Sequence, residues 1–161
     1  YGRSRGLGDV YKRQIKNLLM AVVAANKVLP IEKIIPVLEL IKPVKGRFEE
    51  IGKIRNLSKV ILDYSHTPDA LETCIKNIKD QYKYSKISLV FGCGGNRDKS
   101  KRNKMFKIAK KYSQKIFITS DNSRFENFNS IVRDILGEDR FDNLEVIKDR
   151  DAAIKLSLIH I

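Results

Sequence analysis

Apolar and polar residues follow two different periods along the chain, and the change between them predicts two structural parts. In the first part apolar side chains recur every three or four positions, which is typical of amphipathic helices. Pro30 divides this part into one helix over residues 16–29 and a second over residues 31–41. Pro43 and Gly46 then interrupt the pattern, and we place a domain boundary there.

Beyond this boundary, short apolar runs alternate with amphipathic stretches. Strands are expected over residues 48–54, 59–64, 86–91, 115–119 and 144–147, and helices over residues 68–82, 101–112, 128–136 and from 151 onward. The continuously apolar run at residues 60–62 predicts a strand that is buried on both faces. The alternation from residue 59 onward predicts an α/β fold, with a mostly parallel sheet and helices on both of its faces.

The two ends of the chain break these patterns. Residues 1–14 show no apolar period and hold three glycines and four basic residues against a single acid. Residues 157–161 continue a helical pattern without a stop signal. We interpret both ends as a non-native leader and tail, expect the natural protein to extend well beyond them, and give His160 no role. The remainder divides into residues 15–43 and residues 44–156.

Composition narrows the class of protein. Hydrophobic residues make up 42% and charged residues 32%, an ordinary globular balance, and the longest apolar runs fall short of the ~20 residues that a membrane span needs. The net charge of +13 raises the chance of an anionic partner, although the lysines are spread along the whole chain, as on solvated helix faces. Cys74 and Cys93 have no metal-site spacing and read as free thiols in a reducing compartment, so a cytoplasmic location is expected.

Three polar segments follow three of the expected strands. They cover residues 63–69, 92–102 and 120–124. Ligands bind at the carboxyl ends of the strands in such sheets, so this coincidence predicts a binding site. In the first segment Asp63 and His66 precede a helix N-terminus, which attracts anions and polar groups. Taken alone, the first and third segments fit a turn that only organises the chain somewhat better than a binding site, and the second is weak evidence for one.

The second and third segments differ in the chemistry they offer. The glycines of residues 92–95 let the backbone approach a ligand closely, but the segment has neither P-loop nor dinucleotide-binding spacing. We therefore do not expect it to hold ATP phosphates by itself. In the third segment an arginine can bind a carboxylate and an aspartate can bind an ammonium group, a combination that suits a zwitterionic amino acid.

Four stretches taken together resemble a known family. They read GRFE at residues 46–49, DYSHTPDAL at 63–71, FGCGGNRDKSKR at 91–102 and SDNSR at 120–124. Their order and spacing are similar to those of the Mur ligases, in particular the UDP-N-acetylmuramoyl-tripeptide synthetases (MurE type), over roughly residues 15–156. The resemblance implies a helical end of the central ATPase domain followed by most of a Rossmann-like C-terminal domain.

The resemblance also implies roles for individual residues. Amino-acid binding falls to Arg97, Asp121, Asn122, Ser123 and Arg124, and proximity to the nucleotide to Arg47, Asp63, His66 and Asp98. Ser123 stands where members that add diaminopimelate usually have proline, and Asn96 replaces a more usual aspartate. Arg124 favours diaminopimelate over lysine, because only diaminopimelate carries a distal carboxylate that needs a cation. No catalytic residue and no metal ligand is expected within residues 15–156.

The activity implied is the ATP-dependent addition of meso-diaminopimelate to UDP-N-acetylmuramoyl-L-alanyl-D-glutamate in peptidoglycan synthesis. ATP and Mg2+ would be bound mainly by a central domain outside this chain, which would be inactive alone. A monomer without nucleic-acid or membrane partners is expected. Two alternatives stay open: a lysine-adding ligase of the same family, and a basic, Rossmann-like module that binds nucleic acid. Arg97 and Arg124 converging on one pocket would favour the ligase, whereas a continuous basic face would favour the module.

Overall fold

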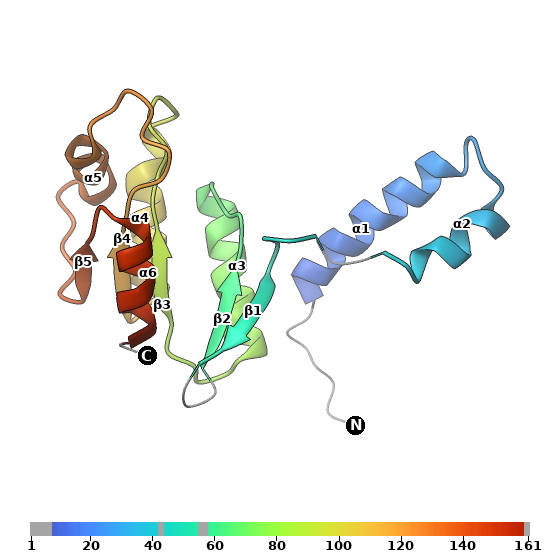
Figure 1. Cartoon of the computed structure of the whole chain (residues 1–161), viewed down its shortest axis with the longest axis horizontal. Helices are drawn as coiled ribbons and strands as arrows, with labels where there is room; N and C mark the ends of the chain where they lie inside the picture. Colours follow the sequence, from blue (N-terminus) through green and yellow to red (C-terminus); the bar gives the residue numbers. More distant parts are fainter. Residues whose placement is uncertain (1–7, 42–43, 55–57, 160–161) are drawn as a thin grey trace.

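The computed structural model describes residues 8–41, 44–54 and 58–159 (Figure 1). In chain order the elements are α1 (Gly8–Ala25), α2 (Ile31–Leu38), β1 (Glu49–Lys53), β2 (Lys59–Leu62), α3 (Pro68–Gln81), β3 (Ser88–Phe91), α4 (Ser100–Tyr112), β4 (Lys115–Ile118), α5 (Phe128–Leu136), β5 (Leu144–Val146) and α6 (Arg150–Ile159). The expected break at Pro43, most of the expected turn at residues 56–58, His160 and the first half of the expected leader lie outside the described residues.

A parallel sheet of three strands, in the order β3–β4–β5, forms the centre of the C-terminal part. Its middle strand β4 carries Ile116, Phe117 and Ile118, none of which is exposed to solvent. A strand with parallel neighbours on both sides is covered on both faces by crossover helices, which explains its unbroken apolar run. The side chains that follow β3 and β4 therefore emerge at the same edge of the sheet.

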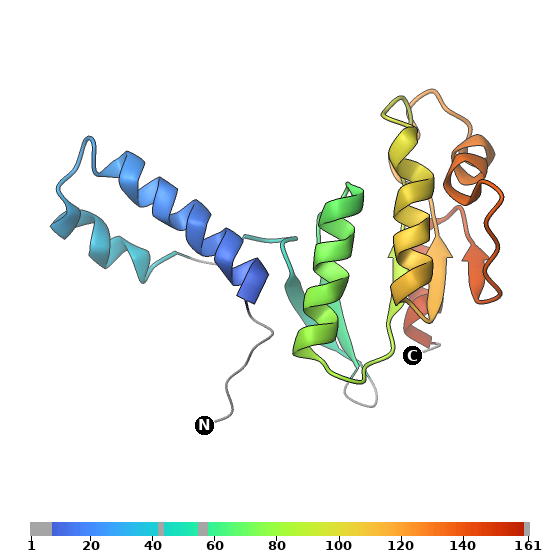
Figure 2. The same ribbon diagram turned by 180° about the vertical axis from the view of Figure 1, so that it is seen from behind.

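Helices cover both faces of this sheet. α4 and α5 pack together on one face, and α6 packs against β3 and β4 on the other (Figures 1 and 2). The core beneath α4 contains Met105, Phe106 and Ala109, which recur on one stripe of the helix and are fully or almost fully buried. α3 lies beside α4 and adds Leu71 and Ile75 to the same core. The expected α/β class, with a parallel sheet between helices, is confirmed.

The position of β2 differs from the expectation. β2 pairs with β1 in a separate antiparallel hairpin, with a bulge between Glu50 and Gly52. The expectation that residues 60–62 are buried on both faces was wrong, since Leu62 keeps 48% of its surface exposed. The physical reason is that β2 lies outside the three-stranded parallel sheet, whose two faces are covered by helices, and pairs only with β1 within the described ranges.

The first two helices depart from their expected bounds, whereas the last agrees. α1 begins at Gly8 rather than at residue 16, and α2 ends at Leu38 rather than at residue 41. α6 continues to Ile159, as the helical pattern of the chain end predicted, and Ser157 is buried. Most apolar side chains of α1 and α2 are exposed, although Ile34 is buried. Both helices project away from the sheet (Figure 1). The division of the chain at residues 43 and 44, and the non-native origin of its ends, stay predictions.

Within the described residues, none of the helices combines the length and the apolar character that a bilayer span requires.

Candidate functional site

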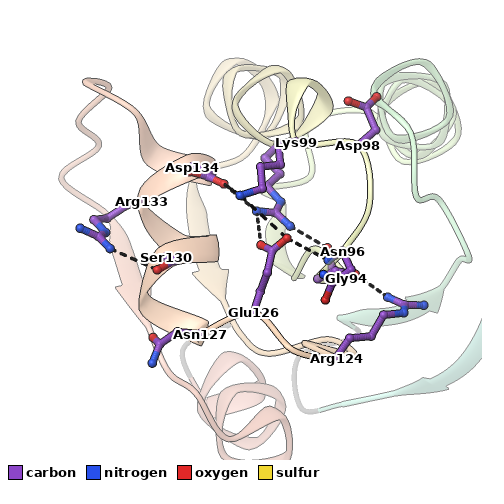
Figure 3. Close-up of polar contacts among 12 residues, drawn as sticks. Gly94, Asn96, Asp98, Lys99, Arg124, Glu126, Asn127, Ser130, Arg133 and Asp134 are labelled. Carbon is purple, nitrogen blue, oxygen red and sulfur yellow. Dashed lines mark hydrogen bonds and ion pairs between the residues drawn. The ribbon is translucent and has the colours of Figure 1, made fainter.

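The loops that follow β3 and β4 lie side by side at the carboxyl edge of the sheet. The backbone N–H of Gly95 donates to the carbonyl of Asn122 at 2.8 Å. Nη1 of Arg124 donates a second hydrogen bond between the same loops, to the carbonyl of Gly95 at 2.8 Å. Figure 3 shows Arg124 reaching toward this loop from the opposite segment. The structure thus joins the second and third of the polar segments singled out in the sequence.

Two glycines make this close approach possible. A Cβ atom built on Gly92 would collide with the carbonyl oxygen of Thr119. A Cβ atom on Gly95 would lie 2.6 Å from the carbonyl carbon of Ser123 and closer still to its oxygen. Carbon atoms of neighbouring side chains normally stay about 3.5 Å or more apart. Only glycine therefore fits at either position while the two loops keep their contact.

Arg124 is held in an uncommon backbone conformation. Its φ is +49°, in the left-handed region that is costly for most residues other than glycine, asparagine and aspartate. Its backbone N–H donates to Oδ1 of Asn122 at 3.2 Å, and Nη1 also donates to the Asn122 carbonyl at 3.3 Å. Nη2 and Nε form no hydrogen bond with the described residues, so one edge of the guanidinium can still bind a carboxylate.

Asp121 lies beside a cation. Its Oδ1 is 3.6 Å from Nη2 of Arg150, at the start of α6, and Nε of Arg150 donates to the carbonyl of Ser120 at 2.9 Å. Ser123 contacts the same turn, donating from Oγ to the carbonyl of Asp121 at 3.4 Å. Asp121 is exposed, and its expected role toward an ammonium group stays a prediction.

Residues 96–98 continue the glycine-rich loop. Asn96 has a φ of +51°, a conformation that asparagine tolerates better than most residues. Arg97 follows it directly and is exposed. Asp98 has a local role, because its Oδ1 accepts the backbone N–H of Ser100, the first residue of α4, at 2.9 Å. Hydrogen bonds from Ser100 hold the pKa of Asp98 below its ordinary value.

A buried charge lies directly beneath these loops. The side chain of Arg102 is fully buried and reaches Oδ2 of Asp134 at 2.6 Å, Oε2 of Glu126 at 2.8 Å and the carbonyl of Gly94 at 3.0 Å. Glu126 uses its other oxygen to accept the backbone N–H of Asn96 at 2.9 Å (Figure 3). Burial alone would lower the pKa of Arg102, but its contacts with Glu126 and Asp134 raise it. The contact with Arg102 lowers the pKa of Glu126.

Arg102 and Glu126 are not among the residues expected from the sequence, although the chain carries a signal for Arg102. Arg102 shares the spacing of Met105, Phe106 and Ala109, so it occupies a position on the apolar stripe of α4. A charged residue on such a stripe must find partners inside the protein, because an unpaired buried charge is very costly. No comparable periodicity identifies Glu126, which lies in an irregular loop.

Three of the four residues expected near a nucleotide lie in or beside the first polar segment, whereas the fourth, Asp98, precedes α4. Asp63 accepts the backbone N–H of Phe48 at 2.8 Å, which ties the segment to the start of β1. The Arg47 guanidinium lies 5.1 Å from the centre of the Tyr64 ring. His66 packs edge-on against the same ring at 5.4 Å, and its Nδ1 is 3.2 Å from the Tyr64 carbonyl. Arg47, Asp63 and His66 therefore form one cluster around Tyr64.

One lysine connects this cluster to the glycine-rich loop. Nζ of Lys101, in the first turn of α4, donates to the carbonyl of His66 at 2.8 Å. The expected helix start at Thr67 is also present, since Oγ1 of Thr67 accepts the N–H of Ala70 at 3.3 Å and Pro68 is the first helical residue. The first turns of α3 and α4 consequently lie close to each other.

The remaining reactive groups offer little chemistry. Cys74 and Cys93 are free thiols, and burial raises their pKa values to about 12 and about 11. Both are therefore poor nucleophiles near neutral pH. In the part of the chain that the structure describes, no group of three or more His, Cys, Asp or Glu side chains is placed to hold a metal ion.

Comparison with known proteins gives consistent results. The family model of the Mur ligase glutamate ligase domain matches residues 46–160. The UDP-N-acetylmuramoyl-L-alanyl-D-glutamate--2,6-diaminopimelate ligase of Rickettsia felis is 41% identical over 148 residues, which cover 90% of this chain and 27% of that protein. The ligase of the same name from Clostridioides difficile is 46% identical over 141 residues, 84% of this chain and 28% of that protein.

Solved structures agree with the sequence comparison. A structure of a ligase with the same name matches with a TM-score of 0.63 and 31% identity, over 89% of this chain and 29% of that chain. A folylpolyglutamate synthase from Thermotoga maritima matches with a TM-score of 0.58 and 28% identity, over 73% of this chain and 26% of that chain. The present chain spans 27–28% of the length of the two curated relatives.

Proposed function

The chain belongs to the Mur ligase family, and from this premise we propose that it is the amino-acid-binding part of an ATP-dependent ligase that adds meso-diaminopimelate to UDP-N-acetylmuramoyl-L-alanyl-D-glutamate. The observation that carries the proposal is the fixed guanidinium of Arg124. It is anchored through Nη1 to the neighbouring loop and keeps its other edge for a carboxylate. The names of the two curated relatives support the same reaction.

The proposed reaction forms an amide in two steps. ATP phosphorylates the carboxylate of the UDP-linked dipeptide, which yields ADP and an acyl phosphate. The amine of diaminopimelate then attacks the acyl carbon, the C–O bond to phosphate breaks, and the amine loses a proton. The domain described here would hold the amine close to that carbon, and such positioning can supply several kcal/mol of the rate enhancement. ATP and Mg2+ would be bound mainly by the central domain of the whole ligase.

The site favours diaminopimelate through charge. Its distal end carries both an ammonium group and a carboxylate, whereas the distal end of lysine carries only the ammonium group. Arg124 and Arg97 would bind the carboxylate, a planar partner that guanidinium groups contact bidentately. Asn122 and Asp121 would contact the amino acid as hydrogen-bond partners, and Ser123 would shape the turn between them. A lysine-adding ligase would gain nothing from Arg124.

The cluster around Tyr64 has a separate proposed role. Arg47, Asp63 and His66 would face the nucleotide, and Asp98 would stabilise the helix start next to it. The N-termini of α3 and α4, which lie close together here, favour negative charge. We further propose that the ligase acts as a monomer in the cytoplasm without nucleic-acid or membrane partners, and the two free thiols fit a reducing compartment.

A chimeric ligase tests the substrate. Residues 46–159 would replace the corresponding segment of an intact diaminopimelate ligase, and ATP-dependent amide formation would be measured with diaminopimelate and with lysine. Arg124→Ala is expected to raise the KM for diaminopimelate by about 100-fold or more, the loss of one charged contact. Arg133→Ala is the matched control, because Arg133 is an exposed arginine on α5 bonded to Ser130 in its own helix. Equal use of lysine, or no effect of Arg124→Ala, would refute the substrate assignment.

A further inference from the structure

We propose that the ion pair of buried Arg102 with half-buried Glu126 positions the amino-acid site, by holding the glycine-rich loop and the loop after β4 in one fixed register. The proposal rests on the proposed function, because it takes Arg97 and Arg124 as the groups that bind diaminopimelate. Neither Arg102 nor Glu126 is assigned a contact with the substrate. Their effect would pass through the backbone of the two loops that carry Arg97 and Arg124.

Arg102 contacts three different segments through one guanidinium. It donates hydrogen bonds to the Gly94 carbonyl in the glycine-rich loop and to Asp134 on α5, and it forms an ion pair with Glu126 after the neighbouring loop. Because the guanidinium is planar and rigid, a shift of one partner displaces the group that holds the other two. A lysine ammonium has a single nitrogen and would not reach all three in this geometry.

Glu126 forms the second half of the arrangement. Its carboxylate accepts the N–H of Asn96, the residue before Arg97. Its own backbone N–H donates to the carbonyl of Ser123, the residue before Arg124, at 2.9 Å. Glu126 therefore fixes the chain immediately before both arginines that are proposed to bind the substrate.

A second bond runs in the opposite direction between the same loops. Oδ1 of Asn96 accepts the backbone N–H of Phe125 at 3.1 Å. Together with the Glu126–Asn96 bond, it joins residue 96 to both residues that follow Arg124. The backbone N–H and the side chain of Asn96, whose φ is +51°, both bond to the same loop. Side chains as well as backbone groups therefore connect the two loops.

The energetics favour a positioning role over a purely stabilising one. Nε of Arg102 and Oε2 of Glu126 are buried and have no hydrogen-bond partner among the described residues, so burial of the pair is not fully compensated. Replacing buried ion pairs by apolar residues of similar volume is often neutral or stabilising. An apolar residue would also suit the stripe of α4 on which Arg102 lies, but it could hold neither the Gly94 carbonyl nor the Glu126 carboxylate.

The chimeric ligase allows a test that separates positioning from stability. Glu126→Gln keeps an oxygen that can accept the Asn96 N–H but removes the charge that pairs with Arg102. The expected result is a roughly tenfold or larger rise in the KM for diaminopimelate, with the KM for ATP within about twofold of the parent, because a displacement near 1 Å can cost up to about 100-fold. Glu145→Gln is the matched control, since Glu145 pairs with Lys115 at 2.6 Å across β4 and β5.

Arg102→Lys and the double variant complete the experiment. If the pair acts as one device, Arg102→Lys should raise the same KM, and the double variant should be little worse than the stronger single variant. An unchanged KM for diaminopimelate in Glu126→Gln overturns the proposal. A parallel rise in the KM values for diaminopimelate and for ATP, together with a loss of thermal stability, also overturns it, because this result indicates a general structural role.

A milder variant covers the case in which Glu126→Gln does not fold. Asn96→Gly keeps the positive φ and removes only the bond to the Phe125 N–H, so a rise in the KM for diaminopimelate of about threefold is expected. No change in this variant overturns the proposal. Failure of the proposed function looks different, because Arg124→Ala would then leave diaminopimelate use intact in the otherwise unchanged chimera.

Discussion

Replacement of Gly95 by alanine is the most direct test of the contact between the two loops. Gly95 lies where the glycine-rich loop meets the loop after β4, and its N–H and carbonyl bond to Asn122 and Arg124. The added methyl group would lie 2.6 Å from the carbonyl carbon of Ser123. Since the obstacle is backbone, rotation of a side chain cannot relieve the collision.

The size of the effect follows from this distance. Two carbon atoms in contact prefer about 3.5 Å or more, so the loops must separate by about 1 Å. That separation would break the Gly95–Asn122 hydrogen bond and move the Arg124 guanidinium away from its anchor. Overpacking of this kind costs about 1–3 kcal/mol of stability. A displacement near 1 Å at a positioning group can lower the rate by about 100-fold.

The assay is amide formation by the chimeric ligase, with kcat and KM measured separately for diaminopimelate and ATP. We expect Gly95→Ala to lower kcat/KM for diaminopimelate by about 100-fold, at a temperature where the variant is still folded. Gly52→Ala is the control, because a Cβ atom at Gly52 would meet no atom within 4 Å. If Gly95→Ala retains the kinetics of the Gly52→Ala control, the tight contact between the loops does not control the site, and the reasoning fails.

Three further predictions concern stability and reactivity. Phe106→Ala, at a fully buried position under α4, is expected to lower the free energy of unfolding by about 3–5 kcal/mol in urea titrations, whereas Tyr84→Ala, at a fully exposed position, should change it little. The pKa of Glu126 is lowered from its ordinary 4.5, so the stabilising effect of the carboxylate is present above pH 4.5 and is lost as the pH falls through the lowered value. The difference in stability between the parent and Glu126→Gln should therefore shrink below pH 4.5. A difference that stays constant with pH would contradict this prediction. With a pKa of about 11, only about one in a thousand Cys93 thiols is ionised at pH 8, so iodoacetamide should label Cys93 slowly until urea unfolds the chain, as mass spectrometry would show.

The elements of the sheet could be predicted from local sequence, because their signals are local. The run at residues 116–118 is apolar without interruption, and Thr67 with Pro68 marks a helix start by well-understood capping chemistry. The surroundings of β2 could not be predicted in this way. An apolar run at residues 60–62 does not reveal which strand pairs with it, and that pairing is determined by tertiary contacts.

The loops of the site were identified from the sequence, but their support was not. Glycines and polar residues at strand ends indicate where a ligand can approach, and the structure brings two of these segments into direct contact. The contacts that hold the two segments together depend on residues far apart in sequence, such as Gly94 and Glu126, which both contact Arg102. In the sequence, only the position of the charged residue Arg102 on an apolar stripe indicated a buried polar contact. No local pattern in the sequence identifies the partner of such a charge.

The left-handed backbone at Arg124 has a consequence for protein engineering. A library that aims at ligases for new amino acids would naturally vary this position, but the φ of +49° restricts which residues fit there. Asparagine, aspartate and glycine adopt this conformation readily, whereas valine, isoleucine and threonine would force the turn to rearrange. Libraries restricted to the first group at residue 124, with Gly92 and Gly95 kept constant, should therefore yield a larger share of folded, active variants than fully random ones.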